Sequence, residues 1–496
     1  MTNLIDLTIH DQDALERAVQ RARERNIIIP TFKQQRDPSL IPDVIKEKLK
    51  DVGLWDIDPL NLFRITWHNE PTADGGSFGG ANYIEFPPEL TGVDAKIVML
   101  VGKWFPTGSH KVGAAFGCLV PRLMTGQFDP TTQKAVWPST GNYCRGGAYD
   151  SKLLACESIA ILPEEMSQER FDWLANVADE TISTPGSESN VKEIFDKCWE
   201  LRESGEDLVI FNQFDEFGNY LWHYEITGPA MLEVLEQVME EGDTFRGVVS
   251  STGSGGTIAS GDYLKVKFPN SKIVASEALQ CPTILNNGFG AHRIEGIGDK
   301  HIPWVHNVKS TDFVTAIDDN DPMNLIRLFN EDAGKAFLVE LGMDAAFVDS
   351  LELLGISSVA NLVSAIKFAK YYEMDSSDVI ISMATDSMEM YGSRLEEMTA
   401  EKGEFTAADA TAVFVRYLQA VTTDNMQELT YLDKRRVHNL KYYTWVEQQG
   451  KTYEEIQAQW YDRDYWTGIS GHIDELDALI DDFNDRVGLL AKLLDE

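Results

Sequence analysis

The sequence lacks any long uncharged apolar run. None of its 496 residues lie in an apolar stretch of the roughly 20 residues that a membrane-spanning helix needs. The first residues, MTNLIDLTIHDQDALERAVQ, carry an early acidic residue and no basic region followed by an apolar one. We therefore expect no secretory signal, no membrane partner and a cytoplasmic location.

Basic residues are scarce. The 43 Lys and Arg residues face 80 Asp and Glu residues, which gives a formal net charge of −37. A nucleic-acid partner or an anionic membrane needs a basic surface to meet its phosphates. The charge balance therefore excludes both and predicts a solvated acidic surface.

Paired cysteines and metal-ligand motifs are also missing. The cysteines at 118, 144, 156, 198 and 281 are odd in number, and no two form a CxxC pair. This spacing argues against structural zinc and favours reduced thiols in a cytosol. The nearest histidine pair, His301 and His306, has no acidic ligand motif beside it. We therefore expect no metal site.

What remains is a globular chain with no internal repeat and no low-complexity linker. A chain of this length divides into two or three lobes in most cases. Short apolar runs alternate with amphipathic helical segments such as 191–203 and 220–238. This alternation predicts an α/β fold with parallel sheets covered on both faces. The apolar runs are 96–102, 135–137, 158–162, 208–211, 247–250, 273–276 and 379–383.

The two ends of the chain differ from its middle. Residues 11–24 have the pattern of a surface helix, and the strand signal fades beyond about residue 400. Residues 473–494 place apolar side chains on one helical face, which favours packing on the chain's own body over packing on a partner subunit. We expect an N-terminal extension at 1–94 that includes the start of the catalytic body, a two-lobed catalytic domain at 95–400 and an acidic helical extension at 401–496.

Lys111 ends the segment Pro-Thr-Gly-Ser-His-Lys, which follows an apolar strand and precedes a helix of small residues at 112–118. A lysine in the first turn of a helix above a strand end lies near the crevice where open α/β sheets bind ligands. When partly desolvated, such an amine attacks aldehydes. A solvated lysine is the common alternative, and the GK[ST] order of a nucleotide P-loop is absent.

Two further loops have the composition of anion sites. Ser139–Asn142 (STGN) offers hydroxyls, an amide and backbone N–H groups for a carboxylate, with an ordinary helix cap as the alternative. Ser251–Thr257 (STGSGGT) follows a strand and has the glycines that let a backbone close on a phosphate. Ile258 stands where the dinucleotide fingerprint has its third glycine. This loop therefore favours a phosphate site over a dinucleotide site.

The fourth motif is Ala384–Ser387 (ATDS), after the strand at 379–383. Its hydroxyl can meet a ring nitrogen or can cap a helix. Each of the four motifs ends a different strand, so we expect them to meet. A lysine, a carboxylate nest, a phosphate cradle and a hydroxyl together match pyridoxal phosphate, which has an aldehyde, a phosphate, a ring oxygen and a ring nitrogen.

From about residue 95 to 395 the chain resembles the fold-type II pyridoxal-phosphate enzymes of the tryptophan synthase β superfamily. The sequence PTGSHK is closer to the lysine motif of tryptophan synthase β-like members. The stretches EITGP (225–229), HRIEGIGDKHIP (292–303) and LGISSVANLVSAIKFAK (354–370) resemble the cysteine synthase and cystathionine β-synthase branch. The resemblance implies two lobes of three-layer α/β structure with parallel sheets, and a homodimer. The residue pattern outside it adds helical extensions at both ends.

The resemblance also implies roles for single residues. Lys111 would carry the cofactor as a Schiff base and move protons at the substrate Cα, and Asn142 would bond the ring oxygen. Thr385 would face the ring nitrogen, although Asp386 beside it leaves that partner open. The phosphate would be held by Gly253, Ser254, Gly255, Gly256 and Thr257. The substrate carboxylate would be held by Ser139, Thr140 and Tyr143, helped by Gln213.

The chain departs from the family pattern in its pocket. Asn69–Thr72 is a poor substitute for the usual N-terminal glycine-threonine-proline motif, and Tyr143 stands where a small hydroxyl residue is common. Arg145 offers a partner for a second acidic group, with a structural arginine as the more frequent alternative.

The resemblance implies a lyase or transferase of amino-acid metabolism. A hydroxyl at the ring nitrogen suits β-elimination or β-replacement on a serine- or cysteine-like small molecule. The alternatives are amino-acid deamination, a tryptophan synthase-like condensation, and a non-catalytic partner protein that keeps the fold.

Overall fold

The computed structural model describes residues 5–495, which form two sheets. The larger sheet has the strand order β1-β2-β10-β7-β8-β9-β11 and the smaller one β5-β4-β3-β6. The larger sheet contains β1 (Tyr83–Phe86), β2 (Lys96–Val101), β7 (Thr244–Ser251), β8 (Lys272–Ala278), β9 (Phe313–Ile317), β10 (Asp378–Ala384) and β11 (Met426–Glu428). The smaller contains β3 (Lys134–Pro138), β4 (Glu157–Pro163), β5 (Glu180–Thr184) and β6 (Leu208–Ile210).

Strand pairing in both sheets is mostly parallel. Only the edge pairs β1–β2 and β9–β11 run antiparallel within the described residues. In β2, Val98 and Leu100 enter one hydrophobic core, while Ile97, Met99 and Val101 enter the other. Because side chains alternate along a strand, a run that is apolar throughout needs cover on both faces. The predicted α/β class with parallel sheets is confirmed.

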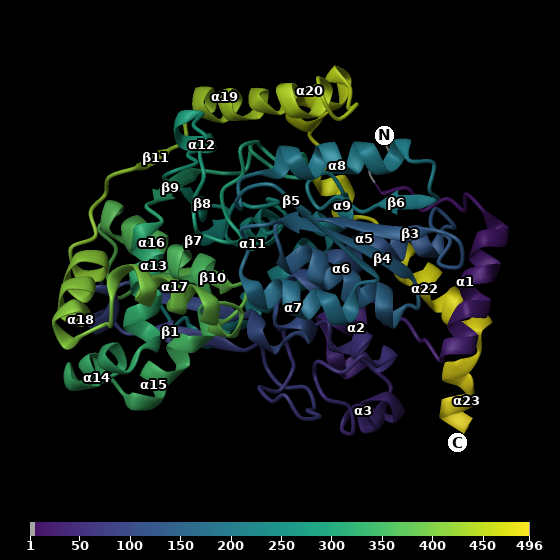
Figure 1. Cartoon of the computed structure of the whole chain (residues 1–496), viewed down its shortest axis with the longest axis horizontal. Helices are drawn as coiled ribbons and strands as arrows, with labels where there is room; N and C mark the ends of the chain where they lie inside the picture. Colours follow the sequence, from purple (N-terminus) through teal and green to yellow (C-terminus); the bar gives the residue numbers. More distant parts are fainter. Residues whose placement is uncertain (1–4, 496) are drawn as a thin grey trace.

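Helices provide that cover. Together with β2, one core contains side chains of α5 (Lys111–Met124), α9 (Phe217–Trp222), α10 (Gly228–Val238) and α11 (Ile258–Lys267). The other contains side chains of α13 (Asn320–Asn330) and α16 (Ile356–Tyr371). The smaller sheet packs with α6 (Asn142–Leu153), α7 (Gln168–Val177) and α8 (Val191–Glu203). We call these three helices and their sheet the small lobe, and the seven-stranded sheet with its helices the large lobe (Figure 1).

Two segments that the sequence predicts as single helices are each interrupted in the structure. The segment predicted at 220–238 consists of α9, a π-helical turn at His223–Thr227, and α10. The segment predicted at 473–494 consists of α22 (Ile473–Val487) and α23 (Leu489–Asp495), separated by Gly488 at φ +74°. The apolar period continues across both breaks, so periodicity alone reveals neither of them.

The two ends of the chain pack on each other. Helix α1 (Gln12–Arg25) contacts α22, and both contact α5. The carboxylate of Asp477 accepts hydrogen bonds from the backbone N–H groups of Phe32 at 2.7 Å and Lys33 at 3.2 Å. Asn484 bonds both backbone groups of Ile29. Figure 1 shows the purple α1 beside the yellow α22. The C-terminal helix therefore packs on its own body, as expected.

The strand β11 corrects the expectation that strands end near residue 400. It has three residues, Met-Gln-Glu, and pairs with β9 at the edge of the sheet. So short a strand carries no apolar alternation, and the sheet edge beside it determines its conformation.

The remaining helices lie around this frame. They are α2 (Phe32–Arg36), α3 (Asp43–Leu49), α4 (Pro88–Thr91), α12 (Thr283–Asn286), α14 (Asp332–Glu340), α15 (Ala345–Ser350), α17 (Gly392–Lys402), α18 (Ala407–Phe414), α19 (Tyr431–Lys441), α20 (Tyr453–Tyr461) and α21 (Tyr465–Ser470). Between residues 5 and 495, no single helix has the length and apolar character that a membrane crossing needs. One pair of helical segments, Ala345–Leu353 and Ile356–Tyr371, has that length and apolar character when the two are taken together, and the chain bends by 116° between them.

Candidate active site

A cleft of about 370 Å³ lies where the loops after β2, β3, β7 and β10 meet. Most of the residues predicted from the four motifs line it. These are Lys111, Ser139, Thr140, Asn142, Tyr143, Gln213, Gly253, Ser254 and Thr385. Gly255, Gly256 and Thr257 continue the loop beyond Ser254 without lining the cleft. The structure therefore brings the four motifs together at the carboxyl ends of the strands, where open α/β sheets bind ligands.

Lys111 begins α5, and its amine reaches into the cleft. The Nζ atom donates a hydrogen bond to Ser254 Oγ at 3.3 Å, which links the lysine to the glycine loop. Burial lowers the pKa of Lys111 to about 8, although the nearby acids Asp299 and Glu188 raise it. An amine with this pKa is neutral in part near physiological pH, and the neutral form is the nucleophile.

Two glycines of the glycine loop lie where a side chain has no room. Gly255 has φ +74°, and a Cβ there would lie 2.8 Å from the Cβ of His306. A Cβ on Gly256 would lie 2.2 Å from Asn219 Oδ1. Asn219 also donates a hydrogen bond to Ser254 Oγ at 3.0 Å. The loop is thus fixed immediately before α11, whose N-terminus favours an anion.

The Ser139–Asn142 loop forms the opposite wall. Ser139 Oγ accepts hydrogen bonds from the Gly141 N–H at 3.0 Å and from Gln213 Nε2 at 3.4 Å. Thr140 Oγ1 donates to a carboxylate oxygen of Glu188. Burial raises the pKa of Glu188 to about 7. Tyr143 lines the same wall, and its hydroxyl has no hydrogen-bond partner among residues 5–495.

Asn142 and the loop after β10 share a hydrogen-bond network. Asn142 Nδ2 donates to Asp386 Oδ2 at 2.7 Å, and the same oxygen accepts from the Tyr391 hydroxyl at 2.7 Å. Asp386 is fully buried in this network, whereas Thr385 lines the cleft. Of these two neighbours, Thr385 is therefore the one with a hydroxyl at the cleft wall.

Several cleft residues had no predicted role. Gly296 and Asp299 belong to the family-like stretch 292–303, so that stretch was a usable signal. Asp299 is 4 % exposed, its Oδ2 has no hydrogen-bond partner within residues 5–495, and burial raises its pKa well above the usual range. Arg170 and Phe214 also line the cleft, but no motif surrounds them, and only the tertiary fold places them there.

The cleft residues fit a phosphate-bearing aldehyde. A partly neutral amine, a glycine loop closed to side chains and a threonine hydroxyl lie around one space. These groups match an aldehyde, a phosphate and a ring nitrogen, which pyridoxal phosphate combines in one molecule.

Comparison with known proteins agrees with a site for pyridoxal phosphate. Over 298 residues the chain is 28 % identical to a probable cysteine synthase of Bacillus subtilis, covering 60 % of this chain and 88 % of that protein. It is 26 % identical over 313 residues to cystathionine beta-synthase of Saccharomyces cerevisiae, covering 61 % and 58 %.

Solved structures share the fold. One is O-acetylserine sulfhydrylase isoform 3 of Entamoeba histolytica, with TM-score 0.54, 22 % identity and coverage of 68 % of this chain and 94 % of that one. Another is the O-acetylserine dependent cystathionine beta-synthase of Helicobacter pylori, with TM-score 0.52, 23 % identity and coverage of 63 % and 94 %.

The family model described as pyridoxal-phosphate dependent enzyme matches residues 104–386. That span begins just before the lysine loop and ends at Asp386, so it includes three motifs whole, the fourth except Ser387, and every residue that lines the cleft. The chain belongs to the family of pyridoxal-phosphate dependent enzymes.

Proposed function

We propose that this protein catalyses β-replacement or β-elimination on a serine- or cysteine-like amino acid, as a cysteine synthase-like enzyme. The observation that carries the proposal is the shared cleft, in which the Lys111 amine faces both the glycine loop and the Ser139–Asn142 loop. The similarity to cysteine synthases and to a cystathionine beta-synthase supports the same chemistry.

When bound, pyridoxal phosphate supplies an electron sink for bonds at the substrate α-carbon. In this proposal Lys111 would hold its aldehyde and the N–H groups of Gly253–Thr257 would hold its phosphate. Thr385 would serve the ring nitrogen and Asn142 the ring oxygen. A threonine hydroxyl is a weak acid, so it leaves the ring less electron-withdrawing than a carboxylate partner would.

The other residues act on the substrate. The Ser139 hydroxyl and the Thr140 N–H bind its carboxylate, and Gln213 supports Ser139 through their hydrogen bond. The Lys111 amine removes the proton from Cα and is the group that returns it. Tyr143 and Phe214 line the cleft and limit the entry of water.

Product analysis tests this function. The loaded enzyme is mixed with O-acetyl-L-serine and sulfide, with L-cysteine alone, and with L-serine and indole. We expect cysteine and acetate from the first mixture or sulfide from the second. Pyruvate and ammonia from L-serine without indole, with no cysteine from the first mixture and no sulfide from the second, would favour deamination. Tryptophan from the third mixture would favour a tryptophan synthase-like condensation. No turnover of any amino acid, with a stoichiometric partner recovered, would favour the non-catalytic alternative.

The pKa of Lys111 gives a pH dependence for cofactor uptake. Because the pKa of Lys111 is about 8, below the ordinary 10.5 of a lysine, the uptake rate of the cofactor-stripped protein should rise through about pH 8 and then level off. Stopped-flow absorbance checks this. In Glu188→Gln the midpoint should move lower, because Glu188 raises the pKa of Lys111. A rate that still rises tenfold per pH unit above about pH 9.5 would contradict it.

The domain boundaries at residues 94/95 and 400/401, a homodimer and a cytoplasmic location are part of the same proposal. All five cysteines are unpaired and buried. Unpaired thiols support a reducing compartment.

A further inference from the structure

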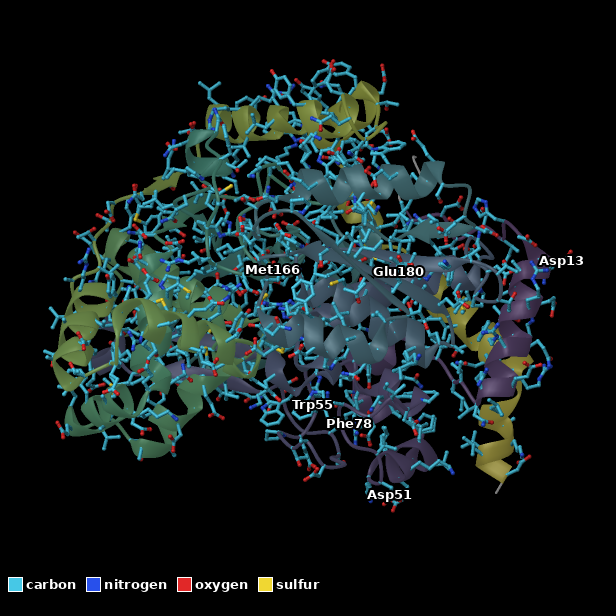
Figure 2. All side chains as sticks on the ribbon, in the orientation of Figure 1. Asp13, Asp51, Trp55, Phe78, Met166 and Glu180 are labelled. Atoms are coloured by element: carbon cyan, nitrogen blue, oxygen red, sulfur yellow. The ribbon has the colours of Figure 1, made fainter. Side chains whose placement is uncertain are left out.

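A second cavity, of about 680 Å³, lies beside the cleft. Trp55, Trp173 and Met390 give it apolar walls, and Figure 2 shows Trp55 on the purple N-terminal segment. Its other lining residues are Thr107, Gly108, Arg145, Glu169, Ser387 and Glu389. Thr107 and Gly108 belong to the lysine loop, and Arg145 lies one helical turn after Asn142. The cavity is thus a neighbour of the reaction cleft with its own lining.

Arg145 is the cation of this cavity. Its residue is 2 % exposed, and its guanidinium carbon lies 4.6 Å from the ring centroid of Trp173. It donates to Thr107 O at 2.8 Å and weakly to Asn142 Oδ1 at 3.4 Å. Within residues 5–495 its Nε has no hydrogen-bond partner, and Arg145 forms no ion pair.

Other buried arginines are compensated. Arg170 and Arg327 each pair with a carboxylate. Arg64 forms no such pair in the described chain, but its guanidinium donates to three carbonyl oxygens and to Asn61 Oδ1. Arg145 has neither a carboxylate nor a full set of carbonyls.

The Asp386 carboxylate attracts Arg145 without forming an ion pair with it in the described chain. Burial of a cation that has no ion-pair partner is unfavourable, so an anion in the cavity would stabilise it. Burial, and then the neighbouring Arg170, lower the pKa of Arg145 to about 10. Thr107 Oγ1 is a second buried polar atom here without a partner among residues 5–495. Thr107 lines the same cavity and carries an O–H donor, and its backbone carbonyl accepts from the guanidinium.

The lining selects the kind of anion. The planar guanidinium matches a carboxylate better than it matches a spherical ion. The acids Glu169 and Glu389 lie in the same lining and repel multiply charged groups such as phosphates. Two indole rings and a methionine favour a ligand with an apolar body.

We propose that Arg145 anchors a second ligand site, separate from the reaction cleft, that binds a small monocarboxylate with an apolar body. The carboxylate pairs with the guanidinium and Thr107 Oγ1, and the apolar body lies between Trp55 and Trp173. This site goes beyond the proposed reaction, because its binding does not depend on which amino acid the enzyme converts.

Calorimetric titration of the pyridoxal-phosphate-loaded protein with 3-phenylpropionate tests the site. This probe has no amino group, so it cannot react as a substrate. Arg145→Met should weaken its binding about 10- to 100-fold, the range for a hydrogen bond to a charged group. Arg202→Met is the matched control, because Arg202 lies 4.6 Å over Trp199 on the surface. The neutral 3-phenylpropionamide should bind at least tenfold more weakly than the acid.

Four results would overturn the proposal. Unchanged affinity in Arg145→Met would show that the probe binds in the reaction cleft instead. Equal affinity for the amide would show that no ion pair forms with the carboxylate. Equal competition by chloride would show a general anion site only. Thermal unfolding separates a structural role. Arg145→Met should melt at or above the wild-type temperature, because it removes an uncompensated buried charge. If it melts lower while Trp173→Leu binds the probe as wild type does, Arg145 is structural and the site is excluded.

Discussion

Lys111→Ala should reduce turnover at least about 1000-fold, because the variant loses both the nucleophilic amine and the proton carrier at Cα. The loaded protein should also lose its visible absorbance, since no other lysine lines the cleft in the part of the chain that the structure describes. Steady-state kinetics and absorbance spectra measure the two losses. The fold should remain, because the change removes a partly desolvated amine from the edge of an open space.

The control for this variant is Lys103→Ala. Lys103 precedes the same loop and makes a 3.9 Å ion pair with Glu352 outside the cleft. It should keep wild-type turnover and absorbance. Turnover like that of the wild type in Lys111→Ala, with circular dichroism unchanged, would refute the assignment of the whole cleft.

Arg170→Met should destabilise the protein by about 3–5 kcal/mol, the usual cost of breaking a buried ion pair. Arg170 is on α7 in the small lobe, and it pairs with Glu295 and, at 3.4 Å, with Asp386. It also donates to the Tyr391 hydroxyl at 2.8 Å. These three partners belong to the large lobe. Without the guanidinium, two buried carboxylates would face each other with less compensation.

Chemical denaturation measures this loss. Lys192→Met is the control, because the side chains of the Lys192–Asp196 ion pair are 66 % and 57 % exposed. A surface pair of this kind contributes about 0–1 kcal/mol. A loss in Arg170→Met that is no larger than in the control would show that the lobes are held together by other contacts.

The central strands could be predicted because their signal is local. The run Lys96–Val101 is apolar at nearly every position, which only a strand covered on both faces explains. The edge strands β1 and β11 are short, so their pairing depends on a sheet that periodicity does not describe. Similarly, the π turn at His223–Thr227 interrupts a helix whose apolar pattern continues without a break.

The site residues also divide into those that local sequence signals predicted and those that they did not. Lys111, the Ser139–Asn142 loop and the glycine loop each follow a strand, so strand prediction and residue type together located them. Arg170 could not be found in this way, because its place in the cleft depends on how α7 packs against the loop after β10. Glu188 was missed for a similar reason, since it is identified by its bond to Thr140 and by no motif of its own.

The packing of the chain ends has a consequence for synthesis on the ribosome. Helix α5 carries Lys111 in its first turn, and α22, which packs against it, emerges roughly 350 residues later. At typical elongation rates that interval is on the order of half a minute. Throughout it, the nascent α5 lacks part of its cover. The packing around the helix that presents the reactive amine is therefore completed only after α22 has been synthesised.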